Sequence, residues 1–187
     1  MKLDKFYEGL KRIANGDYVL EGDLVSEETI EIDLDDRLVV RGKIVSEKSI
    51  VAKFSLIAGC GIKAGWGIEA GWGIEAGEGI EAGEGIEAGW GIEAGEGIEA
   101  GEGIKAGCGI EAGEGIKAGW GIEAGCGIEA KTYIHSKKRI FAGISLYRTS
   151  ENCEKTITCA ELRGGEVCFG DLVITKPEEP SEKNEEE

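Results

Sequence analysis

Apolar residues recur at every sixth position through most of this chain. From 61 to 130 the unit Gly-Ile-Glu/Lys-Ala-Gly-x repeats twelve times without an insertion. Within each unit the Ile and the Ala are two positions apart, so in an extended chain both point to one side and the Glu or Lys between them points to the other. A period of six fits neither a 3.6-residue helix nor a heptad. The pattern predicts short strands joined by corners, whose isoleucines are buried only when successive coils stack.

The residues at the variable sixth position predict how many hexads make one coil. If three hexads make a coil, positions 18 apart stack at about 4.8 Å, and one column then holds only aromatic residues and cysteines. A two-hexad coil mixes Trp, Glu and Cys in both of its columns. We therefore predict a three-faced parallel β-solenoid with about 18 residues per coil. The column that decides this comprises Phe54, Trp72, Trp90, Cys108 and Cys126.

The six-residue phase divides the chain into four parts. It runs from Ile32 to Leu146, so we expect a solenoid over 17–147, with perfect hexads over 61–130. Residues 148–175 should form a closing segment, with a loop at 148–156 and strands at 157–175. We expect an acidic, disordered tail over 176–187 because it combines charge with proline. Six-residue spacing resumes after the loop in another phase, at Leu162, Cys168 and Ile174.

Residues 1–16 show helical spacing of apolar side chains, and Gly16 fits a helix stop. We expect a short helix that caps the open end of the solenoid, because a repeat array needs terminal caps. Dimerisation through the same apolar face, giving a homodimer, is the alternative. The residues of this face are Leu3, Phe6, Tyr7, Leu10, Ile13 and Ala14.

The glycines and cysteines add two expectations. The glycines that flank each corner should supply the positive φ of a tight turn. Neither an 18-residue apolar run nor a signal peptide is present, so we expect a cytoplasmic protein with no membrane contact. In that compartment the six cysteines should be free thiols. With His135 as the single histidine, we expect no metal site and no cofactor.

Charge is the main functional signal. The 187-residue chain has a net charge of −16, which disfavours nucleic acid and anionic membranes as partners and favours basic protein surfaces. Residues 61–130 hold 14 Glu and 3 Lys, a net of −11, over about 19 Å of solenoid axis. Duplex DNA carries about 11 charges over that length. The rod therefore matches DNA in linear charge density.

The 18-residue coil makes the three predicted faces unequal. One face carries glutamates without any basic residue, although like charges stacked at strand spacing destabilise a sheet. A second face carries four glutamates bracketed by Lys63 with Trp66 and by Lys117 with Trp120. A solubilising surface is the plainer interpretation of such residues. The candidate partner-binding residues are Glu75, Glu78, Glu93, Glu96, Glu111, Glu114 and Glu129 on the first face, and Glu81, Glu84, Glu99 and Glu102 on the second.

Three resemblances bear on these expectations. An aliphatic residue at every sixth position resembles the left-handed hexapeptide-repeat acyltransferases, whose catalytic histidine could only be His135 here. Residues 18–58, with VLEGDLVSEETIEI and LVVRGKIVSEKSIVAKF, resemble the polymer-forming bactofilins, which implies right-handed winding. In acidity the chain is similar to nucleic-acid mimics, including pentapeptide-repeat gyrase inhibitors and phage anti-restriction and anti-CRISPR proteins.

The sequence therefore predicts a protein that is not an enzyme. No phosphate-binding loop or nucleophile elbow occurs in it. We expect an acidic binding protein, a nucleic-acid mimic that occupies the basic groove of a nucleic-acid-binding protein. A phage-encoded inhibitor of a host nuclease or CRISPR complex, acting in the host cytosol, is the concrete case. A structural or polymer-forming solenoid scaffold is the alternative.

Overall fold

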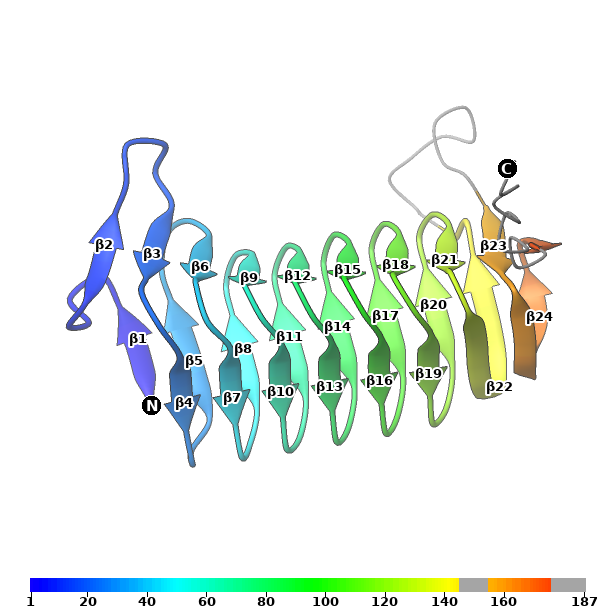
Figure 1. The fold of residues 1–187 in the computed structure, drawn as a ribbon, viewed down its shortest axis with the longest axis horizontal. Coiled ribbons are helices and arrows are strands. Elements are labelled where there is room, and N and C mark those ends of the chain that lie inside the picture. The colour runs from blue at the N-terminus through cyan, green and yellow to red at the C-terminus, as the bar shows by residue number, and fades with distance from the viewer. Residues whose placement is uncertain (145–154, 176–187) are drawn as a thin grey trace, which may run out of the picture.

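Residues 18 apart in the repeats lie side by side in parallel register. Ile62 pairs with Ile80, and Ile80 pairs in turn with Ile98. This pairing confirms the 18-residue coil and excludes the 12-residue one. The structure, a computed structural model, describes residues 1–144 and 155–175. Within them the chain forms an all-β parallel solenoid whose coils stack along one axis (Figure 1).

Each coil of the repeats contributes three strands, and each strand pairs with the strands three before and three after it. Three columns of strands result. The first column contains β4 (Leu24–Ser26), β7 (Ile44–Ser46), β10 (Ile62–Ala64), β13 (Ile80–Ala82), β16 (Ile98–Ala100) and β19 (Ile116–Ala118). The second contains β1 (Lys2–Asp4), β5 (Ile30–Asp33), β8 (Ile50–Ala52), β11 (Ile68–Ala70), β14 (Ile86–Ala88), β17 (Ile104–Ala106) and β20 (Ile122–Ala124).

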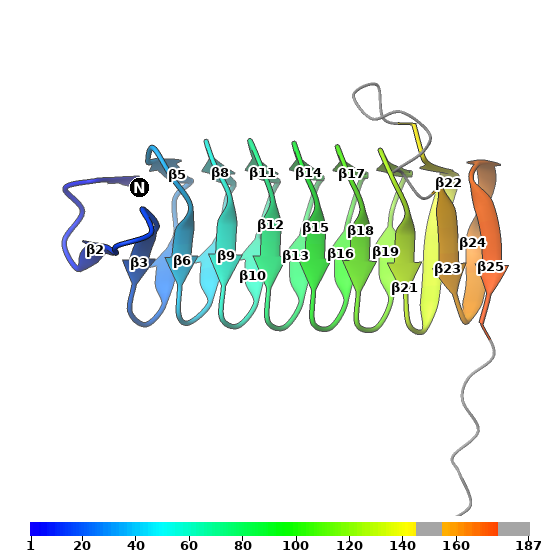
Figure 2. The ribbon, with the colours of Figure 1, turned by 90° about the horizontal axis from the view of Figure 1, so that it is seen from above.

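The third column forms a separate sheet of ten strands, visible along its length in Figure 2. The other two columns join through the long strand β22 (Tyr133–Ala142), and β24 (Glu161–Phe169) pairs with it. The third column contains β2 (Leu10–Arg12), β3 (Tyr18–Leu20), β6 (Leu38–Val40), β9 (Leu56–Ala58), β12 (Ile74–Ala76), β15 (Ile92–Ala94), β18 (Ile110–Ala112), β21 (Ile128–Ala130), β23 (Thr156–Cys159) and β25 (Asp171–Ile174).

The inside–outside alternation follows the sequence pattern. In every repeat strand the Ile and the Ala are buried, while the Glu or Lys between them is exposed in all but β20, where Glu123 is half-buried. Since neighbouring coils place Ile over Ile, the interior is one continuous aliphatic ladder. Among the described residues, no buried side-chain polar atom lacks a hydrogen-bond partner.

The repeat glycines do not have the positive φ that the sequence suggested. Positive φ occurs at Gly9, Gly16, Gly22, Gly143, Gly165 and Gly170, all outside the perfect repeats. The glycine after each Ala is needed instead for close approach between coils. A Cβ on Gly83 would lie 2.0 Å from the carbonyl oxygen of Gly65 in the preceding coil, which is closer than any real contact.

The expected helix over 1–16 is wrong, because this segment forms strands β1 and β2. Leu3 of β1 is buried and pairs with Ile32, while Phe6 is 83% exposed. A helix of this length is marginal by itself, whereas the open edge of β5 offers backbone partners to an extended chain. The apolar helical face therefore does not exist, and a homodimer through it loses its basis.

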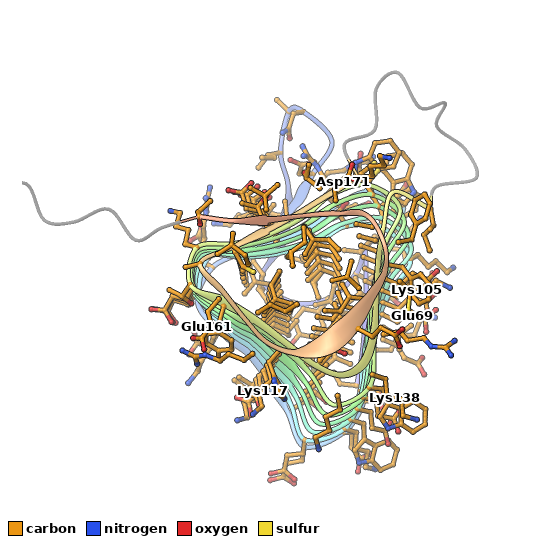
Figure 3. All side chains as sticks on the ribbon, turned by 90° about the vertical axis from the view of Figure 1, so that its right-hand side faces the viewer. Glu69, Lys105, Lys117, Lys138, Glu161 and Asp171 are labelled. Atoms are coloured by element: carbon orange, nitrogen blue, oxygen red, sulfur yellow. The ribbon has the colours of Figure 1, made fainter. Side chains whose placement is uncertain are left out.

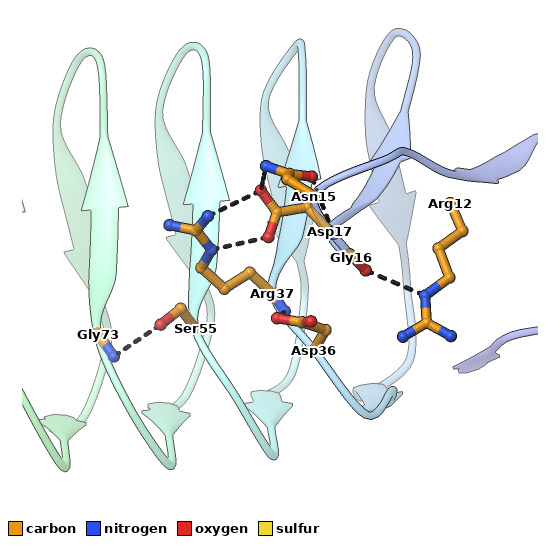
Figure 4. A network of polar contacts seen from close by, with 8 residues as sticks. All are labelled: Arg12, Asn15, Gly16, Asp17, Asp36, Arg37, Ser55 and Gly73. Carbon is orange, nitrogen blue, oxygen red and sulfur yellow. Dashed lines mark hydrogen bonds and ion pairs between the residues drawn. The ribbon is translucent and has the colours of Figure 1, made fainter.

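A partly buried ion pair fixes the hairpin of β2 and β3, which pair in antiparallel fashion. The Arg37 guanidinium donates from Nε to Oδ1 of Asp17 and from Nη2 to Oδ2, both at 2.9 Å. Asn15 Nδ2 donates to the same carboxylate at 2.8 Å (Figure 4). The guanidinium hydrogen bond holds the pKa of Asp17 below its ordinary value, although burial of the carboxyl opposes this.

In the last coil, successive interior residues are five positions apart in the sequence, at Leu162 and Val167, and not six as predicted. In the register of the strands, Leu162 lies on Ile134 and Val167 on Ile140, so Cys168 is not an interior position. The register of β22 with β24 shifts at three points, and Gly165 has a φ of 100°. These irregularities turn the corner in fewer residues.

The predicted loop over 148–156 and the predicted tail over 176–187 lie mostly outside the described residues, which exclude 148–154 and 176–187. Thr156, which was expected in the loop, belongs to β23.

The stacking of Cys108 and Cys126 is as predicted, because the Cys126 N–H donates to the Cys108 carbonyl at 3.0 Å. The expectation of free thiols fails at Cys126, which is disulfide-bonded. The thiols of Cys60, Cys108, Cys159 and Cys168 are free. A rule about redox environment carries no information on which cysteines lie close together in space.

Candidate functional site

An uninterrupted ladder of glutamates runs along the outside of the third column. Its members follow one another in parallel register on β12, β15, β18 and β21. Ile57 precedes the ladder and Thr158 follows it, so both neighbours of the ladder in this row are uncharged. The ladder consists of Glu75, Glu93, Glu111 and Glu129.

A second row of carboxylates lies beside this ladder, at the bend that precedes the first column. The Glu96 N–H donates to the Glu78 carbonyl at 3.2 Å, and the Glu114 N–H donates to the Glu96 carbonyl at 3.1 Å. Both donors sit one coil above their acceptors. We call the two rows together, Glu75, Glu93, Glu111 and Glu129 with Glu78, Glu96 and Glu114, the acidic face. All seven were predicted from the sequence as one group.

The centre of the acidic face is electrostatically unfavourable. Partial burial, together with the neighbouring charges of Glu75 and Glu111, raises the pKa of Glu93 above its ordinary value. The ladder lines a groove of about 540 Å³ together with Trp90 and Arg37, and the Arg37 guanidinium is paired with Asp17. This arrangement offers a row of carboxylates at strand spacing, with an exposed aromatic ring beside it.

The outer surfaces of the other two columns carry compensating lysines. Lys63 Nζ lies 2.8 Å from the Glu81 carboxylate, and Lys117 forms an ion pair with Glu99. In the second column Lys105 Nζ lies 3.7 Å from Glu87. Figure 3 shows Lys105 and Glu69 on one side of the rod and Lys117 on another. The candidates Glu81 and Glu99 are thus partly neutralised within the chain.

The remaining two candidates, Glu84 and Glu102, lie at a bend between the first and second columns. The Glu84 N–H donates to the Trp66 carbonyl at 3.1 Å, and the Trp120 N–H donates to the Glu102 carbonyl at 3.0 Å. The two glutamates are therefore bracketed by tryptophans along the rod, as the sequence indicated. They do not join the acidic face, so the eleven candidates form two separate groups.

Sequence reasoning did not single out a basic cluster at the C-terminal end of the rod. Lys137, Lys138 and Arg139 are consecutive exposed residues of β22, and Lys138 Nζ lies 5.0 Å from the Trp120 ring centre. They line a larger groove of about 1190 Å³ together with Glu69 and Glu87. Its mixed charge favours no single class of ligand. The run His-Ser-Lys-Lys-Arg in the sequence was the available signal.

The described part of the chain shows no arrangement typical of a metal site. In residues 1–144 and 155–175, no three His, Cys, Asp or Glu side chains are placed to hold a metal ion. None of these residues forms a helix that is long and apolar enough to cross a membrane. His135 is half-buried and pairs in register with Lys117.

Comparison with known proteins gives no relative: no family model matches the chain, and no curated protein or solved structure matches it significantly. The protein is a β-solenoid of stacked parallel strands with an 18-residue register, and the geometry of its surface is the basis for a function.

Proposed function

We propose that this protein is a binding protein without enzymatic activity, whose acidic face docks into a basic groove that normally holds nucleic acid. The single observation that carries the proposal is that, among the described residues, no basic side chain forms an ion pair with a glutamate of the acidic face. Each of the other two columns pairs repeat lysines with glutamates of adjacent coils. Within the described chain the acidic face has no such pair, and Arg37, which lines the same groove, is paired with Asp17. The carboxylates of the acidic face therefore remain available to a cationic partner.

The electrostatic cost of the ladder supports the same proposal. Stacked like charges oppose one another, and the charges of Glu75 and Glu111 add to the effect of partial burial in raising the pKa of Glu93. A cationic groove would relieve it, because each basic side chain stabilises the ionised form of the carboxylates that it meets. A partner that normally binds phosphates has this property along a line, which is also how the ladder is laid out.

Two finer features of the rod belong to this proposal. We infer that each column of strands acts as one face of a three-faced rod, so that a partner meets the acidic face alone. A host nuclease or CRISPR complex is the concrete partner class, and a phage-encoded inhibitor acting in the host cytosol is the concrete role. The right-handed winding implied by the bactofilin resemblance stays a prediction.

The experiment compares two triple charge reversals. Glu93, Glu96 and Glu111→Lys alter the acidic face, and Glu69, Glu87 and Glu123→Lys alter the second column by the same charge. Partners are captured from the native host on the immobilised protein and challenged with duplex DNA. We expect duplex DNA to displace the captured partner, and we expect binding to weaken between about 50 mM and about 500 mM salt. Only the variant with the altered acidic face should lose binding. Capture that survives the first reversal, or that ignores salt, contradicts the proposal.

A further inference from the structure

The two ends of the rod differ in how the apolar interior is covered. At the C-terminal end, Leu172 of β25 pairs with the fully buried Ile157, and Ile174 pairs with the fully buried Cys159. Leu172 and Ile174 thus occupy interior positions of the last coil, yet they are 42% and 53% exposed. Phe169 of β24 is also exposed. The aliphatic ladder is therefore uncovered at this end of the described chain.

The backbone is open at the same end. Strand β25 pairs with β23 on one side, and no described strand pairs with its other side (Figure 2). The N–H groups of Asp171 and Thr175 donate to carbonyls of Lys155 and Cys159. Because hydrogen-bonding direction alternates along a strand, the N–H groups of Leu172 and Ile174 point to the open side. Such an edge is a template for another strand.

The N-terminal end, by contrast, is covered by the chain itself. Leu3 of β1 is fully buried, and Met1, Tyr7 and Leu10 pack against the core. The interior positions of the first complete coil, at Leu24 and Ile30, are also buried. Phe6 and Ile13, which stay exposed at this end, lie outside the strands, so no interior position of a coil is exposed here to meet the C-terminal coil of another copy.

The composition of the chain near the C-terminal end bears on what can cover the exposed apolar coil. Residues 155–175 contain two basic and three acidic residues, a net of −1, against −11 for 61–130. The adjoining residues 176–187 hold two basic and six acidic residues, a net of −4, so two copies repel each other at this end as well, and added salt screens that repulsion. Residues 176–187, which follow β25 in the sequence, contain no aliphatic or aromatic side chain other than proline that could add to an apolar core.

We propose that two copies of this protein associate end to end through their C-terminal coils. A two-fold axis between the ends brings β25 of one copy antiparallel to β25 of the other, which satisfies both open edges and buries Leu172 and Ile174 of both. Because the N-terminal ends are covered, growth stops at the dimer. This assembly differs from an open-ended scaffold, and it does not depend on the function of the acidic face.

The test is sedimentation velocity of the full chain from about 1 µM to about 500 µM, combined with small-angle scattering. The contact is one cross-section of the rod, smaller than a standard interface, so we expect a dissociation constant of about 10 µM. The dimer should have twice the 19.8 kDa mass and almost twice the maximum dimension of the monomer. High salt should preserve it, whereas binding through the acidic face weakens in salt.

A pair of Ile→Lys variants separates the two ends of the rod. Ile174→Lys places a charge in the apolar contact and should leave a monomer, with circular dichroism confirming the fold. Ile13→Lys changes a residue of similar exposure, 43%, at the N-terminal end and should leave the dimer intact. The proposal is overturned by a monomer at every concentration, by open-ended growth, by a dimer no longer than the monomer, or by a dimer that survives Ile174→Lys.

Discussion

The indole rings of Trp72 and Trp90 stack with their centres 6.4 Å apart and their planes 20° from parallel. Both rings are more than half exposed, and the side chains belong to successive coils. Phe54 extends the stack, with its ring centre 6.1 Å from that of Trp72. Only the 18-residue register brings these three residues together, so the stacked rings on the surface follow directly from the way the coils stack.

Trp72→Ala should lower the free energy of unfolding by about 1–2 kcal/mol, because it removes both ring contacts of the ladder. Trp66→Ala is the control, since Trp66 is similarly exposed but stacks on no other ring among the described residues. Its effect should stay within about 0.5 kcal/mol. Chemical denaturation followed by circular dichroism measures both variants. Equal losses would show that the ladder adds nothing beyond exposed surface.

Gly83→Ala and Gly85→Ala should differ sharply, although both glycines flank the same bend. The new Cβ at Gly83 meets a backbone oxygen at 2.0 Å, which only a shift of two coils can relieve, so we expect a loss of about 3 kcal/mol. At Gly85 the nearest atom is 3.4 Å away, an ordinary contact. There the reduced freedom of the unfolded chain should leave stability unchanged or up to about 1 kcal/mol higher. Thermal unfolding compares the two, and similar losses would contradict close packing as the reason for these glycines.

Glu93→Gln should stabilise the rod near pH 7. The pKa of Glu93 is raised in the folded state, so its contribution to stability is present below the ordinary pKa of 4.5 and is lost as pH rises through the folded value. The uncharged amide of Glu93→Gln does not ionise, so the variant keeps the stability that the parent loses as Glu93 ionises. We expect its Tm to be about 2 °C above that of the parent at pH 7. The difference in Tm between Glu93→Gln and the parent should disappear near pH 4. A gap of equal size at both pH values would mean that ionisation of Glu93 is not its cause.

Arg37→Ala should destabilise the N-terminal hairpin, because the buried Asp17 carboxylate then keeps only Asn15 as a side-chain partner. Since Arg37 is itself half-exposed, we expect a loss of about 2 kcal/mol at neutral pH. The pKa of Asp17 is lowered in the fold, so this contribution is present above the ordinary value of 3.8 and is lost as pH falls through the folded value.

The gap between Arg37→Ala and the parent should accordingly narrow in acid. Arg12→Ala is the control, because Arg12 contacts the Gly16 carbonyl, the Tyr18 ring and the exposed Asp35 carboxylate, and so it meets no buried carboxylate. That substitution should change the free energy of unfolding by less than about 1 kcal/mol. A loss from Arg37→Ala that is the same at pH 7 and pH 3 would show that the carboxylate charge is not involved.

The sequence by itself determined the repeating part of this protein. A strict six-residue alternation places Ile and Ala inside and Glu outside, and the aromatic column fixes three hexads per coil. Both follow from local rules, because side-chain direction in a strand alternates and identical units stack in register. For the same reason the residues of the acidic face could be grouped before any coordinates were known.

Only the tertiary structure decided the ends of the rod and the role of its glycines. Residues 1–16 have helical spacing, yet pairing with the edge of β5 outweighs a short helix that has no support of its own. The glycine after each alanine is required by a carbonyl of the neighbouring coil, a contact between residues 18 apart that leaves no mark on local backbone preference. The uncovered interior at Leu172 and Ile174 likewise depends on which strands find a neighbour. Local sequence patterns determine which side chains of a strand face the interior and which face the solvent. The packing of segments that are distant in the sequence determines where the stack of coils begins and ends.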